Sequence, residues 1–489
     1  MQYEPVIGLE VHIEMLTRSK MFCACPVVDS TNAAPNTAVC PVCAGHPGTL
    51  PVINGQAVEF ALRVAAALEC ELAPISIFAR KNYFYPDLPK GYQITQYEQP
   101  LAENGKITLQ TSKGEKLIRI RRVHLEEDTG KLTHVEENGH SFSLVDLNRA
   151  GVSLLEIVTE PDFRSAEQVR VYAESLRALV RYLGVNSGDL EKGVMRIEPN
   201  ISVRPFGQDE LGTKVEIKNL NSFRALERGV AYEINRHIEL INSGGKVAQE
   251  TVGWDENKQV TFSQRSKEDA HDYRYFPEPD LPPLLVSKHW MDDVRSALPE
   301  LPWQRSQRFA QDYGLSATES WQLAAEKAAG EYFEAVLTSL VTSRPPNPAE
   351  VRTVYAWVTG ELFALMNISG TGFDTLKIQP NALAELLKMI AAGQVNQNTG
   401  KAILVTMFAS SQSAAQIVSE QGLSQVSDVQ MITELVSAAL AENPTEVANY
   451  RAGKTTVINF LFGQVMRKAG GKANPQVLRS ELERLLQGN

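Results

Sequence analysis

A segment with one charged face lies near the start of the sequence, where residues 6–15 read VIGLEVHIEM. Apolar residues occupy every odd position, whereas Glu10, His12 and Glu14 occupy even positions. Side chains alternate between the two faces of a β-strand, so these three point the same way, about 7 Å apart. We interpret Glu10 and His12 as ligands of a divalent metal ion. The alternative is a solvated strand face.

Strands and helices are interleaved in the first 295 residues, which are rich in short alternating strands, glycine and proline. Ser165 and Gln168 form a capping box that predicts a helix to about residue 183, and a second helix is expected over 222–242. This mixture predicts an α+β fold. The rest of the sequence is helical in character. We expect an α+β domain (1–295), a helical domain (296–410) and a helical tail (411–489).

The composition is that of a soluble globular protein, with 43% apolar and 22% charged residues in a chain of 489. It lacks an apolar run long enough for a membrane span and a secretory signal, so we expect a cytoplasmic or organelle-matrix location. The net charge of −10 means that RNA binding would need a local basic patch. Residues 451–489 contain seven Lys or Arg and two Glu. The candidate RNA contacts there are Arg451, Lys454, Arg467, Lys468 and Lys472.

Four of the five cysteines form two close pairs, Cys23-x-Cys25 and Cys40-x-x-Cys43, separated by fourteen residues. In a reducing compartment such pairs favour metal binding over disulfides. Four thiolates suit a closed, tetrahedral structural zinc site, so we predict a zinc knuckle at about residues 20–47. A reduced loop without metal is the alternative.

Two further acidic segments are candidates for magnesium ligands. Glu126, Glu127 and Asp128 follow a basic strand, and magnesium prefers carboxylate oxygens. Glu156 lies alone in an apolar run, and burying a carboxylate is costly unless it is paired or binds metal. An acidic turn is the alternative for the first segment.

Two other predicted strands, over 195–203 and 213–218, each have one charged face. Cations for phosphate beside carboxylates for magnesium are typical of phosphoryl transfer, where charge neutralisation supplies most of the catalysis. A cross-strand ladder of salt bridges is an equally good interpretation. The candidate nucleotide or substrate contacts are Arg196, Glu198, Asn200, Lys214, Glu216 and Lys218.

A third candidate binding segment, residues 80–92, combines basic and aromatic residues around prolines. Lys81 suits phosphate, and Tyr83 and Tyr85 suit stacking against a base. Residues 272–280 have the same character. A rigid loop held by aromatic packing is the alternative for both segments.

Several of these segments together resemble, in order, the B-subunit family of aspartyl/glutamyl-tRNA amidotransferases. The resemblance covers essentially the whole chain. One departure is Arg-Ile-Glu-Pro-Asn at 196–200, where many members have Arg-Cys-Asp-x-Asn, so the acid is kept but its reach differs. The matching segments are 6–12, 80–93, 126–131, 143–149, 212–224, 272–283, 450–454 and 471–475.

The resemblance implies a cradle-like catalytic domain similar to glutamine synthetase and guanido kinases, a helical domain, and a YqeY-like tail that approaches tRNA. It implies a heterotrimer in which the partners are an amidase (A) subunit and a small (C) subunit. It also implies a carbon–nitrogen ligase (EC 6.3.5.-) that uses ATP and magnesium. Glu-tRNA(Gln) or Asp-tRNA(Asn) would be phosphorylated on its side-chain carboxylate and then amidated with ammonia from glutamine. The implied catalytic magnesium ligands are Glu10, His12, Glu126 or Glu127, and Glu156.

Two other functions remain open on the sequence. A stand-alone carboxylate–amine ligase would need no basic tail for RNA. A non-catalytic, zinc-bearing tRNA-binding subunit would need no acidic face on the first strand. The resemblance also makes zinc structural, because some members lack the four cysteines. The choice between the two tRNAs depends on which synthetases the organism has.

Overall fold

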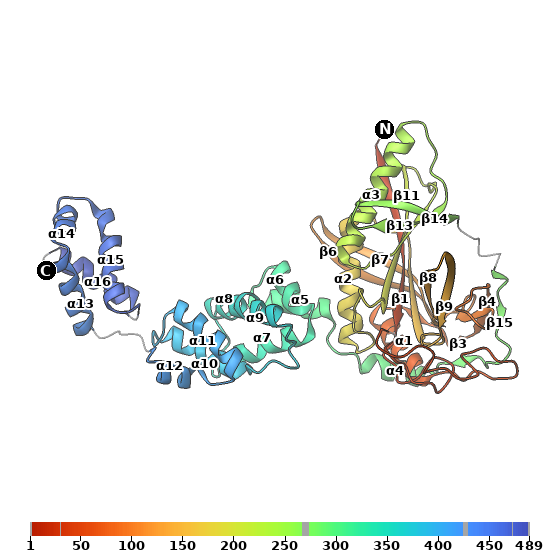
Figure 1. The fold of residues 1–489 in the computed structure, drawn as a ribbon, viewed down its shortest axis with the longest axis horizontal. Coiled ribbons are helices and arrows are strands. Elements are labelled where there is room, and N and C mark those ends of the chain that lie inside the picture. Colours follow the sequence, from red (N-terminus) through yellow and green to blue (C-terminus); the bar gives the residue numbers. More distant parts are fainter. Residues whose placement is uncertain (1, 30, 267–272, 424–428, 472, 488–489) are drawn as a thin grey trace. The chain divides into compact units, whose positions relative to one another are not determined.

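The computed structural model describes residues 2–29, 31–266, 273–423, 429–471 and 473–487. The chain divides into two compact units, Met1–Arg305 and Ser306–Asn489 (Figure 1). The first combines sheets and helices, and the second is helical throughout its described residues. The predicted α+β fold followed by an all-helical region is therefore confirmed.

A nine-stranded sheet forms the first unit, in the order β14-β13-β12-β11-β1-β10-β7-β6-β2. The charged segment that opened the sequence is β1 (Tyr3–Glu14), a central strand. It pairs antiparallel with β10 (Ser153–Thr159) and β11 (Met195–Pro205). The other strands are β2 (Glu71–Leu72), β6 (Ala102–Thr111), β7 (Gly114–Glu127), β12 (Val215–Lys218), β13 (Glu250–Asp255) and β14 (Val260–Ser266).

Helices cover the apolar face of this sheet. Odd-numbered residues of β1, such as Ile7 and Leu9, pack in one core with side chains from the helices. The two predicted helices are confirmed, and the hydroxyls of Ser165 and Ser222 cap their first turns. Even-numbered residues of β1 are left on the opposite, polar face. The helices are α1 (Gly55–Ala67), α2 (Ala166–Tyr182), α3 (Phe223–Asn242) and α4 (Lys288–Ser296).

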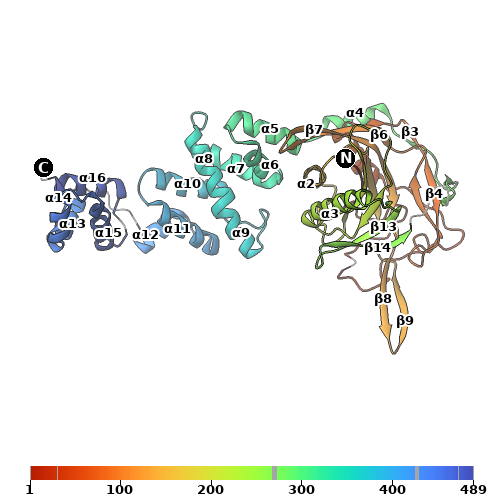
Figure 2. The same cartoon turned by 90° about the horizontal axis from the view of Figure 1, so that it is seen from above.

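Three small sheets complete the unit. One has the order β15-β4-β5, and its β5 packs beside β7 of the main sheet. A hairpin of β8 and β9 projects from the body of the unit (Figure 2). The strands are β3 (Ile75–Ser76), β4 (Phe78–Asn82), β5 (Tyr92–Gln96), β8 (Lys131–Glu137), β9 (His140–Asp146), β15 (Phe276–Pro277) and β16 (Leu284–Leu285).

The second unit contains two separate hydrophobic cores. The first runs from Phe309 to Val418 and the second from Ile432 to Leu486. The expected boundary near residue 410 precedes α12, whose side chains pack in the first of these cores. The helices are α5 (Pro302–Tyr313), α6 (Ala317–Ala324), α7 (Lys327–Leu340), α8 (Pro348–Ala356), the π-helix η2 (Trp357–Leu362), α9 (Phe363–Ser369), α10 (Pro380–Ala391), α11 (Gln397–Ser410), α12 (Ala414–Gln421), α13 (Val429–Glu442), α14 (Pro444–Arg451), the 3-10 helix η3 (Thr455–Val457), α15 (Ile458–Lys468) and α16 (Pro475–Leu486).

Membrane-spanning character is missing from every single helix in the described part of the chain. Among the described helices, one bent pair, α11 with α12, reaches the necessary length and apolarity, and its two helices are bent by 110° relative to each other.

Candidate functional site

The polar face of the main sheet brings most of the candidate residues together. In the antiparallel register, His12 of β1 lies opposite Glu156 of β10, and Glu10 lies opposite Glu198 of β11. Asn200 of β11 lies in turn opposite Glu216 of β12. Residues that are directly opposite share a face of the sheet, so acids from five neighbouring strands converge here.

One group on this face consists of His12, Glu126 and Glu156, whose ligand atoms lie within 4.8 Å of one another. His12 Nε2 is 3.6 Å from Glu126 Oε1 and 3.6 Å from Glu156 Oε2. The side chains are 16%, 3% and 10% exposed, respectively, so the carboxylates are held away from bulk water. Two carboxylates and an imidazole at this spacing can bind a divalent cation.

His124 belongs to the same place, although the sequence reasoning did not select it. Its Nε2 donates to Glu156 Oε2 at 3.0 Å and lies 3.9 Å from Glu126 Oε2. Within the described structure, the buried Nδ1 atoms of His12 and His124 have no hydrogen-bond partner. The sequence could have indicated His124, because it is two residues from Glu126 and therefore on the same strand face.

The charges of this group shift the pKa values of His12 and Glu156. Burial alone would lower the pKa of His12, but Glu156, Glu198 and Glu126 together raise it to about 9. Burial would raise the pKa of Glu156, but the charge and hydrogen bonds of His124 and His12 hold it well below its ordinary value. His12 and Glu156 thus stabilise each other's charged forms within this group.

A second group on the face consists of Glu10, Glu198 and Glu216, again with ligand atoms within 4.8 Å of one another. Lys218 Nζ donates to Glu198 at 3.0 Å, and Asn200 Nδ2 donates to Glu10 at 3.1 Å. The sequence analysis assigned Glu10 and His12 to one ion, whereas the structure places them in different groups. Glu198 and Glu216, selected as substrate contacts, lie in this group with Glu10.

Glu126 and Glu127 point in different directions, which separates the pair that the sequence left open. Glu127 forms an ion pair with Lys90 and accepts a hydrogen bond from Ile94 N at 2.9 Å. Its Oε1 is therefore engaged by the neighbouring β5 region, outside both acidic groups. Of the two, Glu126 is the one that lies with His12 and Glu156.

Arg196 is engaged by acids at one end of the polar face. Its Nη1 is 2.9 Å from Asp128 Oδ2 and 3.6 Å from Glu14 Oε1. Burial and the charge of Asp128 raise the pKa of Glu14 to about 8. Burial would also raise the pKa of Asp128, but the charges of Arg196 and Arg149 outweigh it and hold this pKa below its usual range. The predicted substrate contact is thus part of an ion-pair network.

The two basic and aromatic segments lie side by side. Phe276 of β15 pairs with Arg80 of β4, which brings the described part of 272–280 against 80–92; Asp272 itself lies outside the described residues. Lys81 Nζ lies 5.0 Å from the ring centroid of Tyr273 and 5.8 Å from that of Tyr83. Burial alone would lower the pKa of Lys81, but the charges of Glu126, Tyr275 and Glu156 raise it, so the ammonium interacts electrostatically with the first acidic group.

Two of the selected residues are exposed. Tyr85 is half exposed, and Lys214 is exposed immediately before β12.

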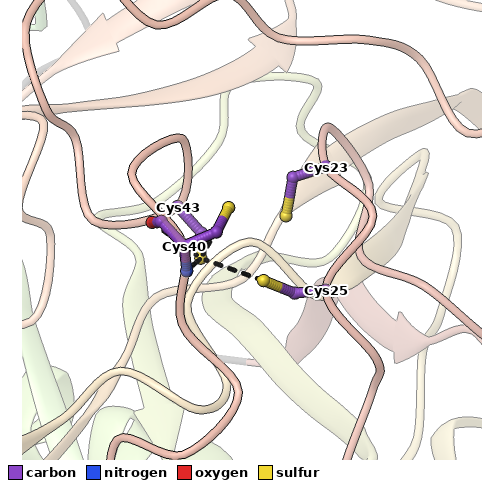
Figure 3. Close-up of side chains that lie close together, drawn as sticks. All are labelled: Cys23, Cys25, Cys40 and Cys43. Atoms are coloured by element: carbon purple, nitrogen blue, oxygen red, sulfur yellow. Dashed lines mark hydrogen bonds between the residues drawn. The ribbon is translucent and has the colours of Figure 1, made fainter.

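The four cysteines converge as their spacing predicts (Figure 3). The Sγ atoms of Cys40 and Cys43 are 3.8 Å apart, and those of Cys25 and Cys43 are 4.0 Å apart. A tetrahedral zinc with Zn–S bonds of about 2.3 Å requires sulfurs about 3.8 Å apart. A hydrogen bond from Cys23, helped by Cys40 N–H and Lys20, lowers the pKa of Cys43 to about 4. The group is compatible with zinc.

The basic residues of the tail are mostly exposed. Arg451, Lys454 and Arg467 face solvent, and Arg451 Nε also donates to Leu486 O at 3.3 Å. Lys468 forms a 2.6 Å ion pair with Glu442. Lys472 lies outside the described residues.

Comparisons with known proteins agree along the chain. A model of the GatB/GatE catalytic domain matches residues 5–292, and a GatB domain model matches residues 336–486. The B subunit of the aspartyl/glutamyl-tRNA(Asn/Gln) amidotransferase from Dehalococcoides mccartyi is 48% identical over 489 residues, 99% of each chain. The protein of the same name from Myxococcus xanthus is 49% identical over 484 residues, 99% of this chain and 98% of the relative. That from Thermodesulfovibrio yellowstonii is 48% identical over 486 residues, 99% of this chain and 100% of the relative. The chain therefore belongs to the family of aspartyl/glutamyl-tRNA(Asn/Gln) amidotransferase B subunits.

Proposed function

We propose that this chain phosphorylates and then amidates the side-chain carboxylate of Glu-tRNA(Gln) or Asp-tRNA(Asn). The observation that carries the proposal is the pair of acidic groups on one sheet face, built on neighbouring even positions of β1. ATP supplies the phosphoryl group and ammonia from glutamine replaces it. The enzyme is thus a carbon–nitrogen ligase with glutamine as amido donor, in keeping with its full-length relatives.

The donor sets fit magnesium, because each contains at least two carboxylates within 4.8 Å. His12, Glu126 and Glu156 would hold one ion, and Glu10, Glu198 and Glu216 a second. Bound magnesium neutralises charge on phosphoryl oxygens in such a reaction. The structural zinc of the four cysteines is separate from this chemistry.

The chain's own cations serve the reaction beside these groups. Lys81 faces Glu126 and Glu156, and Lys218 donates to Glu198. Fixed ammonium groups stabilise the negative charge that develops during phosphoryl transfer. Tyr83 and Tyr273 flank Lys81 and restrict the access of water, which would otherwise hydrolyse the acyl phosphate.

Ammonia must come from another protein of the complex. A glutaminase nucleophile has to be reachable and activated. Cys70 is buried in the core of the first unit, where burial raises its pKa to about 12. The other four cysteines form the zinc-compatible group. We infer a heterotrimer in which an amidase (A) subunit supplies the ammonia and a small (C) subunit is the third member.

The tail is the proposed tRNA contact. Helices α13 to α16 share a core of their own, and Arg451, Lys454 and Arg467 are exposed beside it. Such side chains can neutralise RNA phosphates without reading the base sequence. In this proposal residues 1–295 form the catalytic domain, residues 296–410 form the helical domain, and the tail binds tRNA.

The test combines the purified chain with its partner subunits, ATP, magnesium, glutamine and either mischarged tRNA, and measures the amide formed. Glu10→Ala and His12→Ala should abolish tRNA-dependent ATP hydrolysis without preventing assembly. His134→Ala, at an exposed histidine of the hairpin, is the matched control. Normal amidation by both site variants would reject the metal assignment. Amidation of free glutamate without tRNA would favour a stand-alone ligase.

A further inference from the structure

A buried lysine lies beside the four cysteines. The side chain of Lys20 is completely buried, with 0% exposure, and is among the largest side chains buried to this degree. Lysines are almost never fully buried unless their charge is paired, because removing an ammonium from water is costly. We therefore expect a negatively charged group to contact the ammonium of Lys20.

The contacts of Lys20 identify that partner. Its Nζ donates to Ala38 O at 2.8 Å and to Leu147 O at 3.2 Å, and lies 3.6 Å from Cys43 Sγ. These three contacts use the three N–H donors of an ammonium. The ion pairs of the described residues include none between Lys20 and a carboxylate, and Glu127 is paired with Lys90. The thiolate group is thus the negative charge that Lys20 meets.

The charge of a metal-loaded cluster explains the arrangement. Four thiolates around a divalent ion carry a net charge of −2, and this charge is partly buried because Cys43 is buried. We propose that Lys20 is the counter-charge of the four-cysteine site, and that its ammonium retains the metal by stabilising the Cys43 thiolate. Residues that hydrogen-bond metal ligands typically change metal affinity about 10- to 100-fold.

Lys20 also connects the cysteine loops to the catalytic sheet. Its bond to Leu147 O reaches the turn before β10, and the next residue, Met21, donates to Gly151 O at 2.7 Å. Gly151 N in turn donates to Asp128 O at 2.9 Å. The counter-charge is thus anchored in the body of the first unit, so its position does not depend on the cysteine loops alone.

The first experiment measures zinc release from the purified full-length chain to a chromogenic chelator. Lys20→Met removes the charge and keeps most of the volume, and we expect release at least tenfold faster than from the parent. Lys106→Met is the matched control, because Lys106 is an exposed lysine paired with Glu69 at 3.2 Å. In Lys20→Gln the amide can still donate to the carbonyl oxygens, so the chain should fold. Because the positive charge is absent, this variant should also release zinc faster than the parent.

The second experiment separates counter-charge from simple structural support. Without metal the thiols can protonate, and Lys20 is then a buried cation without its partner. Lys20→Gln should therefore lower the thermal midpoint of the zinc-loaded chain but leave that of the chelator-stripped chain unchanged or higher. Equal destabilisation of both forms, or unchanged zinc release from both variants, would overturn the proposal. Failure of the parent to bind zinc, or to show a cobalt–thiolate absorption band, would overturn it as well.

Discussion

Replacing His124 tests whether the carboxylate of Glu156 is positioned by its neighbour. His124→Ala removes the Nε2–H that lies 3.0 Å from Glu156 Oε2. Glu156 would then keep its charge but lose the donor that fixes its orientation toward His12 and Glu126. We expect the proposed magnesium site to weaken without loss of the remaining ligands, because those belong to other residues.

The expected loss of magnesium affinity can be estimated from the hydrogen bond between His124 and Glu156. A hydrogen bond to a charged group contributes about 1.5–3 kcal/mol. Since about 1.4 kcal/mol corresponds to a tenfold change in a binding constant, magnesium affinity should fall by about 10- to 100-fold. The loss of a residue that orients a metal ligand usually has an effect of this size.

Two measurements test the predicted loss of magnesium affinity in His124→Ala. Manganese binding to the purified complex is followed by electron paramagnetic resonance, and tRNA-dependent ATP hydrolysis is measured as a function of magnesium. In His124→Ala the activity should recover at high magnesium, and His124→Gln, whose amide can donate, should recover part of the affinity. The exposed His134→Ala is the control. Unchanged manganese affinity in His124→Ala would refute the positioning role.

Three further predictions follow from other contacts. Arg196→Met leaves Asp128 without its closest cation. In denaturant titrations it should reduce the free energy of unfolding of the first unit by about 2–3 kcal/mol. Breaking a fully buried ion pair usually costs ~3–5 kcal/mol, and the smaller loss is expected here because the Arg196 side chain is 29% exposed. A reduction under ~0.5 kcal/mol, the usual range of a neutral surface substitution, would contradict it. Burial would raise the pKa of Glu233, but its hydrogen bonds with His237 and other neighbours lower it from 4.5 to about 2. The ionised Glu233 therefore stabilises the folded state above pH ~4.5, and this contribution is lost as the pH falls toward 2. Thermal midpoints of Glu233→Gln should accordingly be lower than those of the parent at pH 7, and the gap should narrow in acid; a constant gap would argue against it. Removing residues 429–489 should weaken tRNA affinity in filter binding more than it lowers activity at saturating tRNA, and an unchanged affinity would exclude the tail as a tRNA contact.

The main features of the fold could be predicted because they depend on local patterns. The alternation in β1 determined both its faces, and the capping box at Ser165 located the start of α2. The order of strands in the sheet could not be obtained in this way. It depends on which strands pair over long separations, such as β1 with β11, and one segment's periodicity contains no record of its partner.

The candidate site was predictable by residue type but not by grouping. Period two correctly placed Glu10 and His12 on one face, yet their nearest acids come from different strands, which divides them between two groups. Glu126 and Glu127 are adjacent, so alternation places them on opposite sides of the strand. The structure shows which side holds Glu127, because Lys90 and Ile94 N both contact it. Lys20 had no sequence signal, because its role arises from burial.

The charge of the polar face determines how the site can bind its substrates. In the proposed reaction, ATP and the acceptor carboxylate are both anionic. The face presents acidic groups with two nearby cations: Lys81, whose pKa is raised by the charge of Glu126, and Lys218, which donates to Glu198. Like charges at such separations repel by several kcal/mol at the reduced dielectric of a protein surface. Two divalent ions would reverse this repulsion, since each brings two positive charges to a place where the acids are already fixed. In the proposed function, a chain with a net charge of −10 acts on polyanions because its acids would bind metal ions at the reaction centre, while RNA contact is assigned to the basic tail.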